Sequence, residues 1–240
     1  MKYKTAIVIG ASSGIGREIV RILAQQGVKV AAVARRRALL DELANEFPNQ
    51  VLAFEHDVLN TGEVPELFLD MTKQLNGLDL FVYCSGVMPE ISPTEFNFEK
   101  DKSMADVNMV GAIAWCNQAA ERFMNTKHGY LVGIGSVAGD RGRQLQPVYN
   151  ASKAFLHTYL EALRNRLSRY GVVVSTIKPG PVETDLARHM TMSKMPVRTA
   201  AEICVSKFDK NGEHYLKLFH RLAFYIIKRI PSPIFRKLKI

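Results

Sequence analysis

Short runs of apolar, β-branched residues alternate along the chain with longer segments whose apolar residues recur every three or four positions. Six of the short runs are apolar at almost every position, which is typical of strands buried on both faces of a parallel sheet. These runs lie at residues 6–9, 28–33, 51–54, 78–83, 130–134 and 172–177. The sequence therefore predicts six parallel strands.

The longer segments predict helices between these strands. One apolar stripe precedes Gly27, a second precedes Pro48, and a third runs from Val64 to Leu75. Two long helices are expected over residues 104–124 and 149–167. Strands and helices that alternate in this way form right-handed βαβ units, so we expect an α/β fold with a doubly wound parallel sheet and helices on both faces.

Nothing in the chain marks a boundary between two domains. It contains no internal repeat, low-complexity segment or Gly/Ser-rich linker. Hydrophobic residues make up 47% of the 240 residues, which is enough material for one sizeable core. We therefore expect a single domain.

The cysteines and the apolar runs limit where the chain can reside. Cys84, Cys116 and Cys204 are odd in number, far apart and without metal-ligand spacing, so we expect neither a disulfide framework nor a metal site. The N-terminal apolar run has no cleavage pattern, and residues 222–227 fall far short of the roughly 20 needed to cross a bilayer. These features favour the reducing cytoplasm.

The net charge of +9 is concentrated at the C-terminal end. Residues 211–240 contain seven Lys or Arg and one acid, Glu213, and so hold six of the nine net positive charges. Nucleic-acid-binding proteins more often spread basic residues over a groove with stacking aromatics. A basic, apolar tail instead suits an anionic membrane surface or an acidic partner, so we expect no nucleic-acid ligand.

A glycine-rich loop follows the first predicted strand and leads directly into a helix. Glycines at this place permit a tight turn and let a pyrophosphate approach the helix N-terminus, where free N–H groups favour an anion. A purely structural turn is the alternative, because the spacing differs from the common GxGxxG pattern. The candidate cofactor-binding residues of the loop are Gly10, Ser12, Ser13, Gly14, Ile15 and Gly16.

The end of the second predicted strand indicates which nicotinamide cofactor is used. A carboxylate there would bind the adenosine ribose of NAD, whereas an arginine would pair with the additional phosphate of NADP. The chain has Ala34 followed by three arginines, which favours NADP(H). Arg35 is the first candidate for the phosphate, with Arg36 or Arg17 in support, while Arg37 fits a solvated helix start.

An acid, Asp57, follows the third predicted strand and precedes Val58. Its position suits a hydrogen bond to the adenine amino group of a dinucleotide. It equally suits a cap on the following helix, and the two interpretations are compatible.

Tyr149 and Lys153 are four residues apart near the start of a predicted helix, so their side chains share one face. A nearby ammonium is expected to lower the pKa of the phenol and so prepare it to exchange a proton with a substrate oxygen. The spacing alone is common in surface helices. However, Ser136 lies at the carboxyl end of the fifth strand, where open parallel sheets bind ligands, and Asn108 lies within the preceding helix.

Taken together, these motifs resemble the short-chain dehydrogenase/reductase family in their order and spacing, over roughly residues 3 to 186. The resemblance implies a single-domain Rossmann-type fold and four catalytic residues. Tyr149 would be the general acid/base and Ser136 would hold the substrate oxygen. Lys153 would contact the nicotinamide ribose and tune Tyr149, and Asn108 would steady a water in the proton relay.

The same resemblance implies a wider set of cofactor-binding residues. Besides the glycine loop, the set comprises Arg35, Arg36, Asp57, Val58, Ser85, Gly86, Tyr149, Lys153, Pro179, Gly180, Val182 and Thr184. Two positions depart from the usual family pattern. Ile9 replaces the Thr before the first glycine, and Tyr83-Cys84-Ser85-Gly86 replaces Asn-Asn-Ala-Gly, which leaves the four catalytic candidates intact.

Residues 1–186 are thus expected to form the dinucleotide-binding and catalytic core, and residues 187–240 a substrate lid with a basic, apolar C-terminal segment. Met190, Met192 and Met195 suit an irregular apolar ligand, although methionine is also an ordinary gap filler. The chain lacks the Gly-rich tail that follows a last strand in many members. Instead it has an apolar helical stripe, Phe219, Leu222, Ala223, Ile226 and Ile230.

This stripe fits two roles equally well: an interfacial helix on a membrane, or a helix that closes the substrate pocket. We expect an NADP(H)-dependent oxidoreductase acting on a ketone or secondary alcohol of lipid or acyl type, peripheral at the inner membrane surface if the helix is interfacial. The alternatives are a β-ketoacyl carrier-protein reductase, a ketosphinganine-like or hydroxysteroid reductase, and a non-catalytic NADP(H) sensor. Family resemblance also implies a homodimer through the two long helices, with a homotetramer less well supported.

Overall fold

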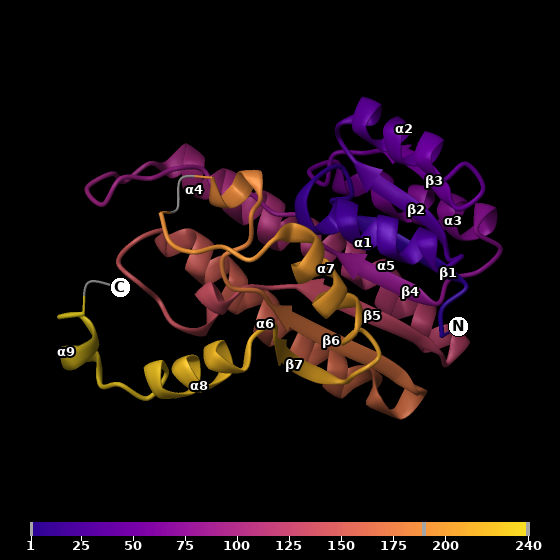
Figure 1. Ribbon diagram of the computed structural model, residues 1–240. Coiled ribbons are helices and arrows are strands. Elements are labelled where there is room, and N and C mark those ends of the chain that lie inside the picture. Colours follow the sequence, from indigo (N-terminus) through magenta and orange to yellow (C-terminus); the bar gives the residue numbers. More distant parts are fainter. Residues whose placement is uncertain (1, 189–190, 239–240) are drawn as a thin grey trace.

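In the computed structural model, which describes residues 2–188 and 191–238, seven parallel strands form one sheet in the order β3-β2-β1-β4-β5-β6-β7 (Figure 1). The six predicted strands are confirmed to within two residues at each end. The strands are β1 (Thr5–Ile9), β2 (Lys29–Ala34), β3 (Val51–Glu55), β4 (Leu80–Tyr83), β5 (Gly129–Ile134), β6 (Val172–Lys178) and β7 (Gly212–Tyr215).

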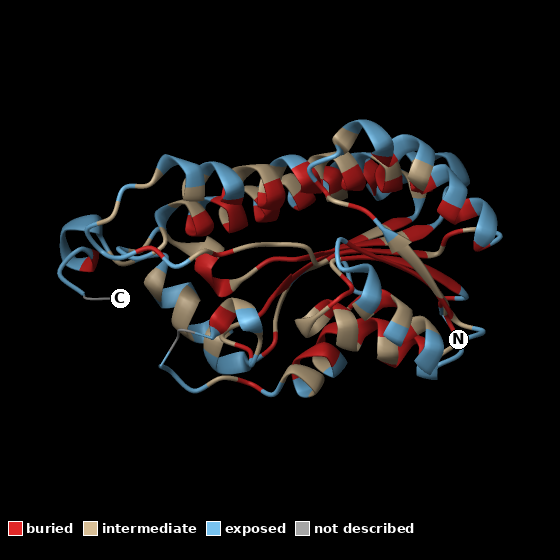
Figure 2. Ribbon diagram, turned by 90° about the horizontal axis from the view of Figure 1, so that it is seen from above, coloured by how far each residue is buried: buried red, intermediate tan, exposed pale blue. Residues whose placement is uncertain are grey.

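Two layers of helices cover the sheet. The core on one face includes residues of α1, α2 and α7, and the core on the other includes residues of α3, α5 and α6. Figure 2 shows the helices turning their buried residues toward the sheet and their exposed residues outward. The helices are α1 (Gly14–Gln25), α2 (Arg37–Glu46), α3 (Val64–Gln74), α4 (Phe98–Ala105), α5 (Gly111–Thr126), α6 (Pro147–Leu167), α7 (Val197–Val205), α8 (Leu218–Ile227) and α9 (Ser232–Phe235).

The order of the strands determines where a ligand can bind. The chain runs outward from β1 through β2 to β3, then returns to the other side of β1 at β4. The connections after β1 and β4 therefore diverge and leave a crevice at the carboxyl edge of the sheet. This doubly wound arrangement confirms the predicted α/β fold.

The helix predicted over residues 104–124 is interrupted in the structure. A π-helical turn, Asp106–Val110, separates α4 from α5. Such a turn inserts an extra residue into the helical hydrogen-bond ladder, and the apolar periodicity does not report it. Asn108, one of the four candidate catalytic residues, lies within this turn.

The C-terminal region contains a strand that the sequence pattern did not predict. Strand β7 pairs in parallel with β6, and Gly212 aligns with Ser175. Its four residues, Gly-Glu-His-Tyr, form no apolar run because β7 lies at the edge of the sheet and is only partly buried. After β7 the chain continues into α8 and α9, which extend beyond the sheet (Figure 1).

Candidate active site

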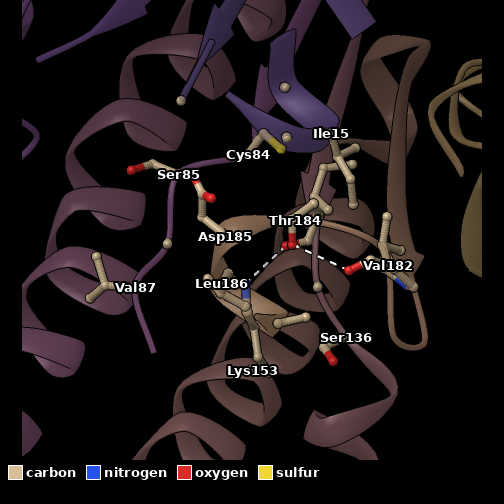
Figure 3. Close-up of a pocket in the computed structure, with 18 of the residues that line it drawn as sticks. Ile15, Cys84, Ser85, Val87, Ser136, Lys153, Val182, Thr184, Asp185 and Leu186 are labelled. Atoms are coloured by element: carbon tan, nitrogen blue, oxygen red, sulfur yellow. Dashed lines mark hydrogen bonds between the residues drawn. The ribbon is translucent and has the colours of Figure 1, made fainter. Parts of the chain in front are cut away.

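A cavity of about 480 Å³ opens at the carboxyl edge of the sheet, beside the crevice between β1 and β4. In Figure 3, Lys153 approaches it from α6 and Ser136 from the segment after β5, whereas Ile15 approaches from the first turn of α1. Nearly all the residues that the sequence assigned to a cofactor or to catalysis line this cavity. Arg17, Asp57 and Asn108 are the exceptions. Asp57 and Asn108 each contact a residue that does line it.

The glycine loop is so closely packed that two of its positions accept no side chain. Gly10 has φ +88°, and a Cβ there would lie 2.7 Å from the backbone nitrogen of Ser85. At Gly16, a Cβ would lie 2.2 Å from the carbonyl oxygen of Gly10. Gly10 therefore comes close to the loop after β4, and the start of α1 comes close to Gly10. The first residues of α1 line the cavity, where the N–H groups of a helix N-terminus favour an anionic group.

Of the arginines considered for the cofactor phosphate, Arg36 lies closest to the glycine loop. Its Nη2 atom donates to the hydroxyls of Ser12 at 2.9 Å and Ser13 at 2.6 Å. Arg35 also lines the cavity, but its Nη1 lies 3.7 Å from a carboxylate oxygen of Asp57. Arg17 pairs with Glu42 at 2.7 Å and is not among the lining residues. In this structure Arg36 is thus the arginine whose side chain contacts the serines of the glycine loop.

Asp57 forms a turn rather than facing the cavity directly. Its Oδ1 atom accepts a hydrogen bond from the backbone N–H of Leu59 at 3.1 Å, while its neighbours His56 and Val58 line the cavity. The helix-capping interpretation is not met, because the next helical turn begins at Thr61 without a side-chain cap. Its other carboxylate oxygen forms an ion pair with Arg35, which lines the cavity.

Tyr149 and Lys153 lie together near the start of α6 and are both buried. The Lys153 Nζ atom is 5.7 Å from the centroid of the Tyr149 ring and donates to the carbonyl oxygen of Ile134 at 3.1 Å. Burial lowers the pKa of Lys153 to about 8. The ammonium is therefore held at the end of β5, between the tyrosine and the loop after β4.

The pKa of Tyr149 differs from the sequence-based expectation. Burial raises it to about 12, and a hydrogen bond with Ser136 and the charge of Arg143 offset this only in part. Lys153 is not among the groups that shift this pKa, so the lowering expected from the ammonium is absent and the loss of solvent around the phenol dominates. At neutral pH the side chain is a protonated phenol, able to donate a proton.

Ser136 lies two residues after the end of β5, at the carboxyl edge of the sheet. It is the N-cap of a 3-10 turn, Val137–Asp140, and its hydroxyl oxygen accepts from the N–H of Ala138 at 3.1 Å. The same hydroxyl is hydrogen-bonded to Tyr149 and lines the cavity. A substrate oxygen at this place would meet two neighbouring hydroxyl donors, one from Ser136 and one from Tyr149.

Asn108 connects the catalytic helix to the loop after β4. Its Oδ1 accepts from the N–H of Val87 at 2.8 Å, and its Nδ2 donates to the carbonyl oxygen of Val87 at 3.0 Å. The same Nδ2 also lies 3.1 Å from the hydroxyl of Ser152, which lies between Tyr149 and Lys153 on α6. In this structure the buried Asn108 side chain therefore ties the loop after β4 to α6 by hydrogen bonds.

The unusual tetrapeptide after β4 has a structural explanation. The hydroxyl of Tyr83 donates to the carbonyl oxygen of Val107 at 2.8 Å and so supports the π-helical turn that carries Asn108. A Cβ on Gly86 would lie 3.3 Å from Asn108 Oδ1 and 3.5 Å from Lys153 Nζ. Tyr83 thus supports the turn that carries Asn108, and the glycine that follows leaves space for the side chains of Asn108 and Lys153.

The loop after β6 forms the opposite wall of the cavity. Pro179, Gly180, Val182 and Thr184 all line it, as the sequence predicted. A Cβ on Gly180 would lie 2.2 Å from the ring of His220 in α8. Glycine is needed here because α8 packs directly against this loop.

Several lining residues were not identified from the sequence. His220 and Phe224 belong to α8, Leu186 to the loop after β6, and Arg143 to the segment before α6. Arg143 lies in the charged run Asp-Arg-Gly-Arg that follows the Ser136 motif, and this run was the available signal. Its guanidinium group donates from Nη2 to the side-chain oxygen of Asn150 at 3.2 Å.

The methionines of the expected lid have different environments. Met192 lines the cavity and is largely exposed, whereas Met195 is buried in the core and forms a bridge with Val182. Met190 lies outside the described residues. Across the parts of the chain that the structure describes, no group of three or more His, Cys, Asp or Glu side chains is arranged to hold a metal ion. Likewise, no helix there is both long and apolar enough to span a bilayer.

Comparison with known proteins agrees with this geometry. The sequence model of the short chain dehydrogenases matches residues 4–194. An uncharacterized oxidoreductase of Myxococcus xanthus is 38% identical over 98% of this chain and 96% of its own length. These matches cover the glycine loop, the Tyr149 and Lys153 pair and the loop after β6.

Solved structures of low sequence identity share the fold. A short chain dehydrogenase of Burkholderia cenocepacia in complex with NADP has a TM-score of 0.86 at 20% identity, covering 100% of this chain and 98% of its own. A single-residue variant of the actinorhodin polyketide ketoreductase with NADPH has a TM-score of 0.79 at 22% identity, covering 89% and 95%. With a family match that spans most of the chain and a relative of this identity, the protein belongs to the short-chain dehydrogenase family of oxidoreductases.

Proposed function

We propose that this protein is an NADP(H)-dependent oxidoreductase that interconverts a ketone and a secondary alcohol on an apolar substrate. The observation that carries the proposal is the convergence of Tyr149, Lys153 and Ser136 on a cavity that also includes the glycine loop. A proton donor, a cation and a second hydroxyl thus face a site that suits a dinucleotide.

Features of this chain fit a dinucleotide phosphate. The glycine loop and the first residues of α1 line the cavity, where a pyrophosphate could approach the helix N-terminus, and the Arg36 guanidinium lies beside the loop serines. An arginine suits the phosphate that distinguishes NADP from NAD, and no carboxylate occupies the end of β2. Two of the structural neighbours hold NADP or NADPH, which supports the same cofactor.

The proton chemistry follows from the protonation states of the side chains. When bound, a nicotinamide cofactor supplies or accepts the hydride at the substrate carbon. In the direction of reduction, the Tyr149 phenol donates its proton to the carbonyl oxygen, which Ser136 positions by a hydrogen bond. The resulting phenolate is stabilised by the ammonium of Lys153, so the product oxygen carries the proton that Tyr149 lost.

The substrate side of the cavity is mainly apolar. Leu186, Met192 and Phe224 line it, and Arg143 adds one cation near Tyr149. These contacts favour a lipid-like or acyl substrate. The lining residues Met192, His220 and Phe224 also support treating residues 187–240 as a lid and pocket wall on the 1–186 core. The polyketide ketoreductase among the structural neighbours is consistent with a ketoacyl substrate, including one on a carrier protein.

The long helices α5 and α6 offer a surface for self-association. The hydroxyl of Tyr159 in α6 donates to Asn117 in α5 at 2.7 Å, and Phe155 stacks on Tyr159 at 5.6 Å between ring centroids. These two long helices thus form one outward surface, which we propose as a homodimer interface. Light scattering of the purified protein measures the oligomeric state directly.

The experiment that tests the function is a carbonyl screen followed by NADPH absorbance. We expect oxidation of NADPH with apolar ketones and much slower oxidation of NADH. A panel should compare small ketones, steroid ketones, 3-ketoacyl thioesters and a ketoacyl carrier protein. Tight NADPH binding without turnover of any ketone would instead identify a cofactor sensor.

A further inference from the structure

The C-terminal segment has an exposed apolar surface, which we call the outer face. Of the large hydrophobic side chains that are exposed in the described part of the chain, half lie between residues 218 and 238. Phe219 is 72% exposed and Ile226 is 62% exposed. The outer face comprises Leu218, Phe219, Leu222, Tyr225 and Ile226 of α8, with Ile234 and Leu238 from the segment that follows.

The opposite side of α8 is packed against the protein. His220 lies over Gly180, and both His220 and Phe224 line the substrate cavity. The guanidinium of Arg141, from the turn after Ser136, donates to the carbonyl oxygen of Ile227 at 2.7 Å. The outer face is therefore exposed on a helix that is held in place, with its inner side already used.

A buried carboxylate adds to this attachment. The side chain of Asp140 has no exposed surface and accepts from Lys178 at 2.8 Å and from the hydroxyl of Tyr215 at 2.7 Å. Lys228, directly after α8, also lies 2.8 Å from it. These partners come from β6, β7 and the end of α8. The direction of α8 relative to the sheet is thus determined by interactions outside the outer face.

The sequence already offered two roles for this helix, and the structure assigns them to different sides. The stripe that includes Phe219, Leu222 and Ile226 points outward, while His220 and Phe224 form the pocket wall. Closing the pocket therefore does not explain the outward apolar residues. A hydrophobic surface of this kind needs a partner.

The charges around the outer face indicate what that partner is. Residues 217–238 contain six Lys or Arg and no Asp or Glu. Arg229 lies over the ring of Tyr225, 3.6 Å from its centroid, which places a cation directly at the apolar surface. A second copy of this face would bring like charges together, whereas an anionic lipid surface is complementary in both charge and polarity.

The location of the outer face connects it to the cavity. Figure 1 shows α8 and α9 extending beyond the sheet at the end of the molecule where α4 lies. The outer face and the pocket wall are two sides of the same ten-residue helix. A surface that binds the outer face would therefore lie one helix diameter, about 10 Å, from the substrate cavity.

We propose that the outer face of α8 and α9 docks on the surface of an anionic lipid bilayer and holds the substrate cavity beside it. The apolar side chains enter the interface between headgroups and acyl chains, and the basic side chains contact the headgroups. A membrane-dissolved ketone then reaches the cavity past α8. This last step rests on the proposed reductase function, whereas the docking itself does not.

The docking is tested by sedimentation of the full chain with vesicles. We expect binding to vesicles of phosphatidylcholine with phosphatidylglycerol, and much weaker binding to phosphatidylcholine alone. The Ile226→Glu variant should lower the partition coefficient at least tenfold. Leu69→Glu, on α3, is the matched control, because Leu69 is 53% exposed and the charge change is equal. We expect it to affect vesicle binding only as far as the added carboxylate lowers the net charge of the protein by one unit.

A charge variant, melting curves and the oligomeric state of each protein make the result decisive. The double variant Arg221→Gln/Arg236→Gln should weaken binding and reduce its salt dependence, because two exposed cations are lost. Melting curves should show that Ile226→Glu is folded. Failure of the wild-type protein to bind anionic vesicles would overturn the proposal. So would a wild-type dimer that Ile226→Glu converts to a monomer without any effect on vesicle binding.

The second half of the proposal has its own measurement. Turnover of a water-insoluble long-chain ketone carried in anionic vesicles should fall at least tenfold in Ile226→Glu, while turnover of a small soluble ketone stays unchanged. Equal turnover of the insoluble ketone by both proteins would overturn delivery from the bilayer. Absence of turnover with either ketone would instead contradict the proposed reductase function and leave the vesicle-binding result to stand alone.

Discussion

The Nη1 atom of Arg141 lies 2.7 Å from the carbonyl oxygen of Ile227, the last residue of α8. The same guanidinium lies 4.2 Å from the ring centroid of Phe235 in α9. A cation at a helix C-terminus satisfies carbonyls that have no partner within the helix and interacts favourably with the helix dipole. This contact links the turn after Ser136 to the helix that forms the pocket wall.

We expect Arg141→Ala to loosen α8 from the catalytic core. Hydrogen bonds to charged groups contribute about 1.5–3 kcal/mol each, so local opening of α8 should become at least tenfold more frequent. Amide hydrogen exchange in α8 should therefore accelerate, and the KM for an apolar ketone should rise. Arg169→Ala is a matched control, because Arg169 lies in the turn after α6 and its guanidinium lies over the ring of Tyr170 rather than at α8. Unchanged exchange in α8 would contradict this role.

Tyr149→Phe is expected to lower kcat for ketone reduction by at least about a hundredfold, because it removes the proton donor and little of the volume. The affinity for NADPH, measured by fluorescence titration, should change little. Tyr159→Phe provides a control on the same helix, since its hydroxyl bonds Asn117 on the other side of α6 from the cavity. Turnover close to that of the wild type in Tyr149→Phe would refute the assignment.

Lys153 carries a stability cost that depends on pH. Burial lowers its pKa from 10.5 to about 8. Because the folded pKa is the lower one, the unfolded chain binds more protons between those values, and the free energy of unfolding rises with pH across that window. Below pH 8 the cost approaches about 3 kcal/mol, since one pKa unit corresponds to about 1.4 kcal/mol.

The Lys153→Met variant removes this titration while also abolishing the cation. The free energy of unfolding of the variant minus that of the wild type should therefore be largest at about pH 7. This difference should become smaller as the pH approaches about 10. Urea unfolding of both proteins at a series of pH values measures the difference, in which other titrating groups cancel. A difference that is constant with pH would show that Lys153 is not destabilised by burial.

Arg36→Ala should raise the KM for NADPH by about ten- to a hundredfold and leave the KM for NADH nearly unchanged. The reason is that Arg36 lies against Ser12 and Ser13, where a charge-assisted contact to a phosphate is worth about 1.5–3 kcal/mol. Arg35→Ala should have a smaller effect, because Arg35 is 61% exposed and faces Asp57. Arg37→Ala is the control, since Arg37 pairs with Asp41 on the solvent side of α2. A larger effect at Arg35 would reverse the order proposed from the structure.

The parts of the fold that were predictable are those recorded in local sequence patterns. Each buried strand of a parallel sheet is apolar on both faces, and this made β1 to β6 visible. β7 was not visible, because an edge strand with the sequence Gly-Glu-His-Tyr is held by pairing with β6 rather than by its own burial. The π-helical turn at Asn108 was also missed because it is supported by a distant residue, Tyr83 of β4, whose hydroxyl donates to the carbonyl oxygen of Val107.

The candidate site divides in the same way. The glycine loop, Ser136, Tyr149 and Lys153 carry local motifs, and the structure gathers them around one cavity. Arg143, His220 and Phe224 belong to no motif and line the cavity only because loops from distant parts of the chain meet there. The raised pKa of Tyr149 could not be inferred from spacing, because it depends chiefly on how completely the phenol is buried.

The sequence by itself determined the doubly wound fold, the positions of the candidate catalytic residues and the basic, apolar character of the C-terminal segment. These follow from periodicity, motif spacing and composition, which are properties of neighbouring residues. Only the tertiary structure decided which side of α8 faces the cavity and which arginine lies at the glycine loop. Those outcomes depend on contacts such as that of Arg141 with Ile227, 86 residues apart, which packing alone establishes.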